Sequence, residues 1–223
     1  VIQVEKPTVR MSFGVNTSPL AGKEGRWSTS RHLRERLYEE LRHNVSLQVE
    51  DTSQADTFVV SGRGELHLAI LIETMRREGY EFQVSRPTVI LQQDQDGQTL
   101  EPYEEVHLQI PADTVGAVVE MLSKRRGEMV SMADASDGSV LMTFQVPTRG
   151  LLGFRYQFLT ATRGMGLMSS VFYRFGPVAG HLYHTVQTQF GNHYPLQLQE
   201  DITVIGDPED LHLFFPVFSH SMV

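Results

Sequence analysis

The sequence predicts an α+β protein in which one arrangement, βαββαβ, occurs twice and is followed by a β-leaning C-terminal segment. Short runs of alternating apolar residues, typical of strands, are interleaved with apolar residues at three- and four-residue spacing, typical of helices. With 223 residues, 40% of them hydrophobic, the chain has room for about two packed domains. The expected boundaries are 1–92 and 93–177 for the two units and 178–223 for the segment that follows.

The first unit begins with an alternating strand and continues into a helix. Ser28-Thr29-Ser30 supplies N-cap candidates, and Leu33, Leu37 and Leu41 then form an apolar stripe. A second helix is expected over 66–77, and Gly79 fits the left-handed position that ends many helices. The expected strands are 8–15, 45–49, 57–61 and 80–90, the last interrupted at Pro87.

The second unit repeats this order. Asp113 is expected to cap a helix that Gly127 ends, and a further helix is expected over 150–163, ended by Gly164. Pairing the four strands of each unit in one antiparallel sheet, with both helices on one face, gives two ferredoxin-like sandwiches in tandem. The expected strands are 103–110, 128–132, 140–146 and 167–173, and the β-leaning tail has runs at 181–189 and 211–218.

Composition limits the classes of function. The net charge of −8 argues against a protein that coats nucleic acid through bulk charge, and no Lys or Arg follows Arg174. The absence of Cys removes disulfides, Cys-zinc sites and thiol catalysis, which fits a cytoplasmic protein. No apolar run is long enough to span a membrane. The start at Val1, without a signal-peptide pattern or an initiator Met, suggests a fragment or a processed chain.

One stretch, Ser61 to Leu68, joins an expected strand to an expected helix through Gly62 and Gly64. Two interpretations are open. Free N–H groups at the start of a helix can hold a phosphate. Alternatively, the glycines form a tight structural turn that leaves Arg63 at the surface. The third glycine of a dinucleotide-binding fingerprint is missing, because His67 stands in its place, and the second interpretation is therefore favoured.

Several motifs resemble the BipA/TypA family of translational GTPases. They are Phe13-Gly-Val-Asn-Thr-Ser-Pro-Leu-Ala-Gly22, the Ser61–Leu68 stretch with its Gly-Glu-Leu-His, Met75-Arg-Arg-Glu-Gly-Tyr-Glu81, Glu101-Pro-Tyr-Glu104 and Arg149-Gly-Leu-Leu-Gly-Phe-Arg155. The resemblance covers about residues 5–178. Gly-Glu-Leu-His is shared with elongation factor G and LepA, whereas the Asn-Thr-Ser-Pro loop points more narrowly to BipA.

The resemblance implies two ferredoxin-like domains, like the third and fifth of elongation factor G. It implies the ribosome as partner, through rRNA and ribosomal proteins, with tRNA as a further candidate, and a monomer. GTP and Mg²⁺ are implied only for a full-length protein, because Ala21-Gly-Lys-Glu24 lacks the hydroxyl of a phosphate-binding loop. No cofactor or catalytic residue is therefore expected here. The tail departs from the family's basic C-terminal domain, so none of its residues is assigned a role.

Cationic clusters are the candidate ribosome-binding residues, each with a plain structural alternative. Cations at a helix C-terminus are favoured by the helix dipole, and cations in or after a long loop can simply be solvated. The other interpretation is contact with RNA phosphates, which fixes position without reading sequence. The candidates are Lys23, Arg26, Arg63, Lys124, Arg125, Arg126, Arg149, Arg155 and Arg163, with Arg31 and Arg34 beside the first two.

Other classes of function find less support. The nine His residues show no metal-ligand spacing, even at His181 and His184, and no nucleophile elbow is visible. The alternative hypothesis is a tandem ferredoxin-like regulatory module that binds a small molecule between its domains. It differs from a ribosome-binding chain by ligand-dependent thermal stabilisation without ribosome association.

Overall fold

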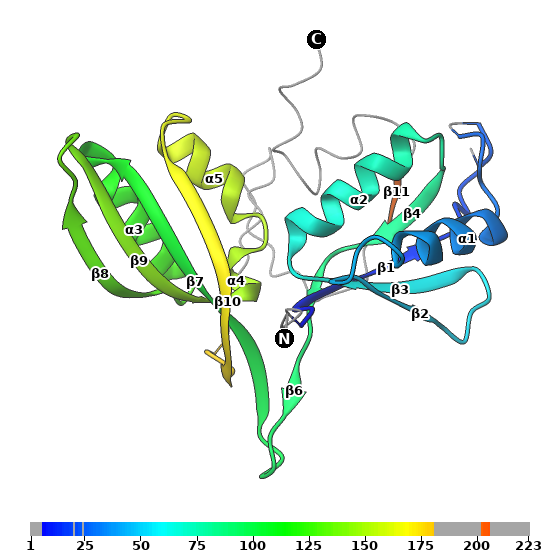
Figure 1. The fold of residues 1–223 in the computed structure, drawn as a ribbon, viewed down its shortest axis with the longest axis horizontal. Coiled ribbons are helices and arrows are strands. Elements are labelled where there is room, and N and C mark those ends of the chain that lie inside the picture. Colours follow the sequence, from blue (N-terminus) through cyan, green and yellow to red (C-terminus); the bar gives the residue numbers. More distant parts are fainter. Residues whose placement is uncertain (1–5, 20, 24, 181–201, 206–223) are drawn as a thin grey trace.

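A computed structural model describes residues 6–19, 21–23, 25–180 and 202–205. Two α+β sandwiches lie beside each other, each with the order βαββαβ (Figure 1). Both sheets are antiparallel, and the strands of each unit take the spatial order fourth, first, third, second. This is the ferredoxin-like arrangement, so the predicted fold is confirmed. The expected tail runs at 181–189 and 211–218 lie outside the described residues.

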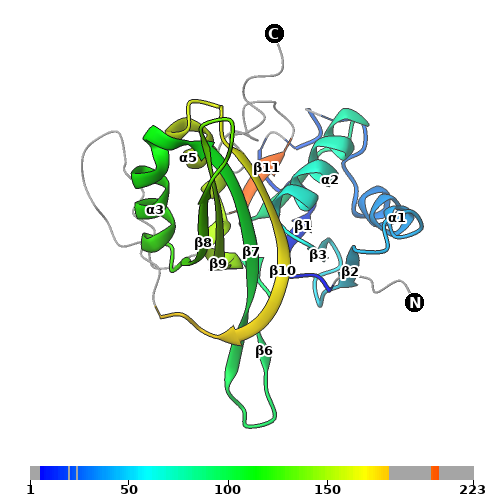
Figure 2. The ribbon, with the colours of Figure 1, turned by 60° about the vertical axis from the view of Figure 1, so that its left-hand side comes forward.

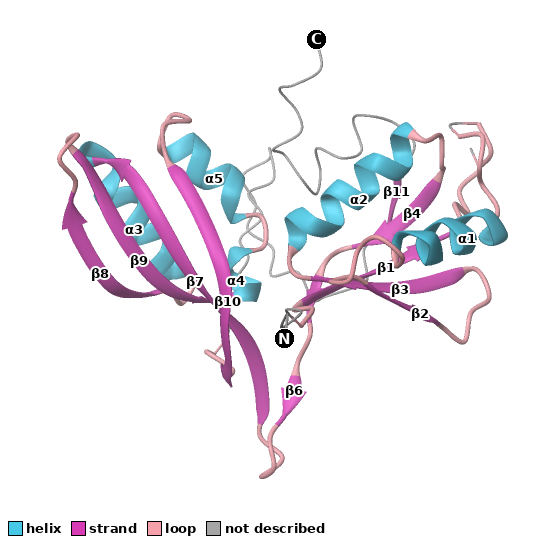
Figure 3. Cartoon of the chain, viewed as in Figure 1, coloured by secondary structure: helices cyan, strands magenta, loops and turns pink. Residues whose placement is uncertain are grey.

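The first sandwich has the sheet order β4-β1-β3-β2, with α1 and α2 packed on the same face (Figure 3). Strand β5 also pairs with β1, because the chain continues past Pro87 in the same direction and resumes antiparallel pairing further along that strand. Strand β11 pairs with β4 at the sheet edge. The elements are β1 Val9–Gly14, α1 Ser30–Glu40, β2 Gln48–Asp51, β3 Thr57–Gly62, α2 Glu65–Arg77, β4 Phe82–Ser85, β5 Thr88–Val89 and β11 Ile202–Ile205.

The second sandwich has the sheet order β10-β7-β9-β8 and carries its helices on one face (Figure 2). Strand β7 is long, and its first residues pair with β6 in a hairpin that projects from the sandwiches. The elements are β6 Gln92–Gln93, β7 Thr99–Pro111, the 3₁₀ turn η1 Ala112–Thr114, α3 Val115–Lys124, β8 Glu128–Asp134, β9 Ser139–Pro147, α4 Thr148–Leu151, α5 Phe154–Ala161 and β10 Leu167–Pro177.

Each sandwich has its own apolar core. The stripe predicted for the second helix packs inward, because Leu68, Leu71, Ile72 and Met75 of α2 are all buried against the first sheet. In the second sandwich, Phe154 and Phe158 of α5 are buried among the inward side chains of β7 and β9. Among the described helices, none combines the length and the apolar character that crossing a bilayer requires.

Helix α2 ends as its sequence predicted. Gly79 has a φ of +87° and donates its N–H to Arg76 O, while Tyr80 N donates to Met75 O. These two bonds form a Schellman motif, which satisfies carbonyls that the helix end would otherwise leave unpaired. Thr29, one of the three predicted N-cap residues, accepts the His32 N–H at the start of α1.

The two ends of α3 differ from prediction. Asp113 does not cap the helix, because its carboxylate accepts instead from Arg163 Nη2 (2.6 Å). At the other end, Arg126 rather than Gly127 adopts the left-handed conformation, with a φ of +64°. Gly127 is needed for a different reason, since a Cβ at this residue would lie 3.0 Å from Leu122 O. Gly127 itself lies just past the helix end, where it was predicted, and its N–H donates to Leu122 O (2.8 Å).

The helix predicted over 150–163 is two helices. Gly153 breaks it with a φ of +67°, so α4 ends at Leu151 and α5 begins at Phe154. The apolar spacing of Leu151, Phe154 and Phe158 is helical on both sides of the break, which is why the pattern concealed it. Gly164 ends α5 as predicted, but Arg163 before it is also left-handed, with a φ of +53°.

Candidate functional site

A cleft of about 460 Å³ lies between the two sandwiches. The first sandwich contributes the start of α2 and the turn before it, and the second contributes α4, the start of α5 and one face of β10. Three cations line it, namely Lys6, Arg63 and Arg155, together with the carboxyl groups of Glu65 and Glu104. Lys6 and Arg63 are exposed, whereas Glu104 is buried. Glu65 and Arg155 are half-buried, so Glu104 is the most enclosed of these charged groups.

The two carboxyl groups hold protons more tightly than usual. Burial raises the pKa of Glu65 to about 7, against the bond from Gly153 N–H, which favours the ionised form. The negative charge of Glu104 raises this pKa further, and Arg125 and Arg155 lower it. Burial also raises the pKa of Glu104, outweighing the hydroxyls of Ser170 and Thr148. Both carboxyl groups are therefore protonated at a higher pH than an exposed glutamate would be.

The segment between α4 and α5 forms one wall of the cleft and is fixed from two sides. Arg125 Nη1 donates to Gly150 O (2.6 Å) and to Leu152 O (3.2 Å), and its guanidinium lies over the Phe154 ring. Leu152 packs against the core of the first sandwich. Arg125 thus stabilises the second sandwich, and most of its N–H donors already make hydrogen bonds within the protein.

The turn over Gly62 and Gly64 has one required glycine. A Cβ on Gly62 would lie 2.9 Å from His67 Nδ1 and 3.1 Å from Leu68 Cδ2. Gly64 has an extended backbone with a φ of 171°, and a Cβ there would meet nothing within 4 Å. His67 Nδ1 lies 3.3 Å from Arg63 N and accepts its N–H, which completes a tight turn. The tight-turn interpretation accounts for Gly62, whereas Gly64 is permitted rather than required.

We expect Gly62→Ala to lower the free energy of unfolding by about 1–3 kcal/mol, since the added methyl overpacks the start of α2. Gly64→Ala, two residues away in the same turn, is expected to change it by less than about 0.5 kcal/mol. Urea unfolding of both variants measures the difference. Equal losses for the two variants would contradict the assignment of the crowding to Gly62.

The other cations predicted in the second sandwich are mostly held by carboxylates. Arg149 pairs with Glu101, which is 0% exposed, and also donates to Gly180 O. Arg163 pairs with Asp113, and Lys124 pairs with Glu120 at 2.6 Å, both at exposed positions. Arg126 is exposed at the end of α3. Of the predicted cations, the structure brings only Arg63 and Arg155 to the lining of the cleft.

Lys23 and Arg26 lie on the predicted loop that precedes α1, and both are exposed. Glu81 holds this loop in place through its carboxylate, which is buried at 2% exposure. It accepts from Asn16 Nδ2 (2.7 Å), Gly22 N (2.8 Å) and Gly25 N (3.0 Å). The loop is therefore tethered at Asn16, Gly22 and Gly25, and its two cations are not among the residues that line the cleft.

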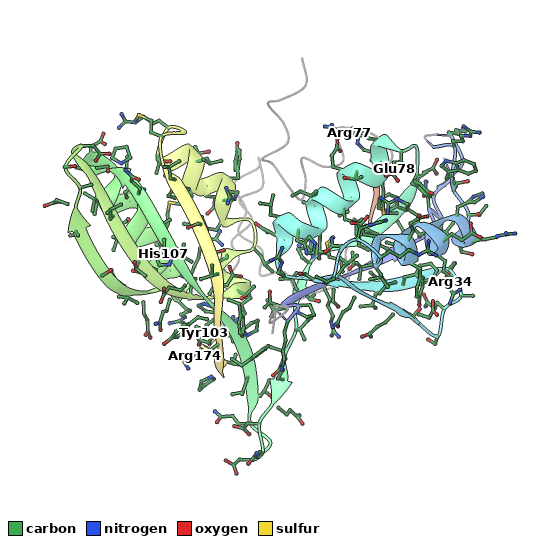
Figure 4. All side chains as sticks on the ribbon, viewed as in Figure 1. Arg34, Arg77, Glu78, Tyr103, His107 and Arg174 are labelled. Atoms are coloured by element: carbon green, nitrogen blue, oxygen red, sulfur yellow. The ribbon has the colours of Figure 1, made fainter. Side chains whose placement is uncertain are left out.

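Three further charged side chains labelled in Figure 4 have structural partners. At the end of α2, Arg77 pairs with the buried Glu73, and Glu78 pairs with Arg36 of α1, which ties the two helices together. On the second sheet, the Arg174 guanidinium lies 5.3 Å from the centre of the Tyr103 ring. Among the described residues, no group of three His, Asp or Glu is placed to hold a metal ion.

Sequence reasoning missed Lys6, Glu65, Glu104 and Leu152 as residues of the cleft. Glu65 resembled an ordinary acidic residue in a first helical turn, and Leu152 an ordinary apolar residue. Their partners lie far away in sequence, as with Glu65 and Gly153, 88 positions apart. No local pattern carries that information.

Two family models match the chain in succession. Residues 26–86 match elongation factor G domain III, and residues 98–186 match the elongation factor G C-terminus. The chain is 53% identical over 182 residues to the chloroplastic TypA-like protein SVR3 of Arabidopsis thaliana. It is 51% and 48% identical to proteins named large ribosomal subunit assembly factor BipA, from Synechocystis and Bacillus subtilis. The chain belongs to the BipA/TypA family.

The matches cover 81%, 85% and 80% of this chain but only 27%, 32% and 29% of these three relatives. The chain thus corresponds to a minor part of a BipA/TypA protein, made of two elongation factor G-type domains. The resemblance drawn from the motifs is confirmed, and so is the tandem of ferredoxin-like domains that it implied.

Proposed function

We propose that this chain is a ribosome-binding part of a BipA/TypA translational GTPase that takes part in assembly of the large ribosomal subunit. The observation that carries the proposal is the identity of about one half to proteins named for that role, across both domains. Hydrolysis of GTP would belong to another part of such a protein. The chain would act where ribosomes are assembled in the cytoplasm, as a monomer, by shape and cationic contacts rather than by catalysis.

The cleft cations are the residues on which we centre the RNA contacts. Arg63 and Arg155 come from different sandwiches and line one cleft, so a single phosphate-bearing strand could contact both domains at once. Such contacts fix position without reading sequence, and double-stranded RNA is recognised largely by backbone and shape. Lys23, Arg26 and Arg126 are exposed and supply further candidate contacts, with rRNA or with tRNA. Lys124, Arg125, Arg149 and Arg163 are weaker candidates because carboxylates or backbone carbonyls already pair with them.

Sedimentation of the chain with purified large subunits over a series of KCl concentrations tests this proposal. We expect binding that weakens as salt rises, because cations that neutralise phosphates release counterions. The variant Arg63→Gln/Arg155→Gln should bind more weakly. It should also reduce the slope of log affinity against log salt by about one for each phosphate that is no longer neutralised.

A matched variant separates a local effect from a general loss of charge. Arg42→Gln/Arg86→Gln removes two exposed arginines that do not line the cleft, and it should leave binding nearly unchanged. Absence of binding by the unchanged chain at low salt would reject the proposed function. Equal weakening by the two double variants would reject the cleft as the RNA-binding surface.

The cleft also favours the second candidate, a regulatory module that binds a small molecule between its domains, because its volume suits a ligand pocket. Such a module would gain thermal stability from a ligand and would not sediment with ribosomal subunits. A screen of anionic metabolites by thermal shift, run beside the sedimentation series, distinguishes the two candidates.

A further inference from the structure

One hydrogen bond crosses from the first sandwich to the second beside the cleft. Glu65, the first residue of α2, accepts the N–H of Gly153 through Oε2 at 2.8 Å. Gly153 stands at the N-cap of α5 in the left-handed conformation and has no side chain with which to cap the helix. In a capping box, a glutamate of the same helix reaches back to the N-cap N–H. Here a glutamate of the other sandwich makes that contact.

The residues around this bond connect the two sandwiches firmly. Leu152, next to Gly153, packs into the first core, while Arg125 holds the carbonyls on either side of Leu151 to the second sandwich. The short helix α4 lies against β5 of the first sandwich. Separation of the sandwiches at this wall of the cleft would therefore break the Glu65–Gly153 bond and withdraw Leu152 from the first core.

The charged groups that face Glu65 come mainly from the second sandwich. Glu104 of β7 faces it with a like charge, and Arg125 at the end of α3 and Arg155 of α5 face it with opposite charges. On its own sandwich, Arg63 and His67 lie in the same turn, and Lys6 lines the cleft nearby. When the sandwiches are docked, burial by the second sandwich opposes ionisation of Glu65. When they separate, the carboxylate regains water.

We propose that Glu65 is a proton-sensitive latch that holds the two sandwiches in this orientation while its carboxyl group is neutral and releases them as it ionises. A neutral carboxyl still accepts the Gly153 N–H through its carbonyl oxygen, and it is free of the cost of burying a charge. The latch concerns only the docking of the two sandwiches, so it stands or falls independently of ribosome binding.

The direction of the pH dependence follows from the raised pKa. In the docked state the pKa of Glu65 is about 7, against 4.5 for the ordinary group. Protonation therefore favours docking fully below about pH 4.5, and this contribution is lost as the pH rises through about 7. Between pH 5 and pH 8.5 the docking equilibrium constant is expected to fall by up to nearly two orders of magnitude. Glu104, whose pKa is also raised, changes docking in the same direction.

A distance measurement between the sandwiches tests the latch. The sequence has no Cys, so the substitutions Arg42→Cys and Ser123→Cys, at exposed positions on opposite sandwiches, give two unique sites for spin labels. Double electron–electron resonance at pH 5.5 should give one narrow distance distribution. At pH 8.5 we expect a second, broader population of distances, which grows as the pH rises from 5.5.

Three variants of the labelled chain make the outcome decisive. Glu65→Gln keeps the acceptor without a charge and should give the narrow distribution at both pH values. Glu39→Gln, an exposed carboxylate of α1, should behave as the parent chain does. Glu104→Gln should retain the pH dependence with a shifted midpoint. The proposal is overturned if the parent chain gives the same distribution at both pH values, or if Glu65→Gln retains its pH response.

Discussion

Replacing Arg149 by Met is expected to lower the free energy of unfolding by about 3–5 kcal/mol, because it removes one partner of a buried pair and leaves an uncompensated charge in the interior. Glu101 is 0% exposed and depends on Arg149 for charge compensation, with Arg149 Nη2 3.2 Å from Glu101 Oε1. In the variant, Ala179 N, at 2.7 Å from Glu101 Oε1, would still donate to the carboxylate but would not neutralise it. This is the largest single-residue effect we foresee, and urea unfolding measures it.

Two controls test whether the loss of stability in Arg149→Met comes from the buried charge of Glu101. The double variant Glu101→Gln/Arg149→Met removes the buried charge with its partner and should recover much of the stability. Arg163→Met breaks an ion pair on the same sandwich whose partners are 66% and 57% exposed. It should cost no more than about 1 kcal/mol. If Arg149→Met and Arg163→Met cost the same, burial is not the reason for the effect.

Replacing Glu81 by Ala is expected to cost about 3 kcal/mol and to release the loop before α1, since buried donors that lose their acceptor are costly. The carboxylate, at a position that is 2% exposed, accepts hydrogen bonds from Asn16 Nδ2 and from the backbone N–H groups of Gly22 and Gly25. Amide hydrogen exchange of Gly22 and Gly25 should accelerate together in the variant.

The loop variant has a graded companion and a surface control. Glu81→Gln keeps an acceptor oxygen in place and should lose less stability than Glu81→Ala. Glu39→Ala, at an exposed carboxylate, should leave both amides protected. Unchanged exchange at Gly22 and Gly25 in Glu81→Ala would show that the loop does not depend on this carboxylate.

Local pattern predicted the elements well where one periodicity governed a whole segment. The stripe of α2 and the glycine that follows it were predicted correctly because both depend on neighbours within one turn. The helix over 150–163 was wrong because Gly153 interrupts it without disturbing the apolar spacing. Gly127 was predicted to end α3 and lies just past that end, but the sequence did not show that Arg126 takes the left-handed conformation or that Leu122 O keeps Gly127 small.

The site was predictable only in part, for a different physical reason. The sequence shows which residues carry charge, and it correctly placed Arg63 in an exposed turn. It does not show that Arg149 has a buried partner 48 positions away, or that Glu65 reaches Gly153 across a domain boundary. These pairs are set by the packing of complete sandwiches. A cation predicted for RNA can therefore be occupied by a protein carboxylate that no local pattern reveals.

The pair of Glu101 and Arg149 also determines how force would pass through the molecule. Ala179 donates to Glu101 and Gly180 accepts from Arg149, so the chain that leaves β10 is fastened to the beginning of β7. Tension applied beyond Gly180 would act on the bonds to Glu101 and Arg149 before it acts on the hydrogen bonds between β7 and β10. Since the first residues of β7 form a hairpin with β6, which follows the first sandwich, such a load would travel toward the junction of the two domains.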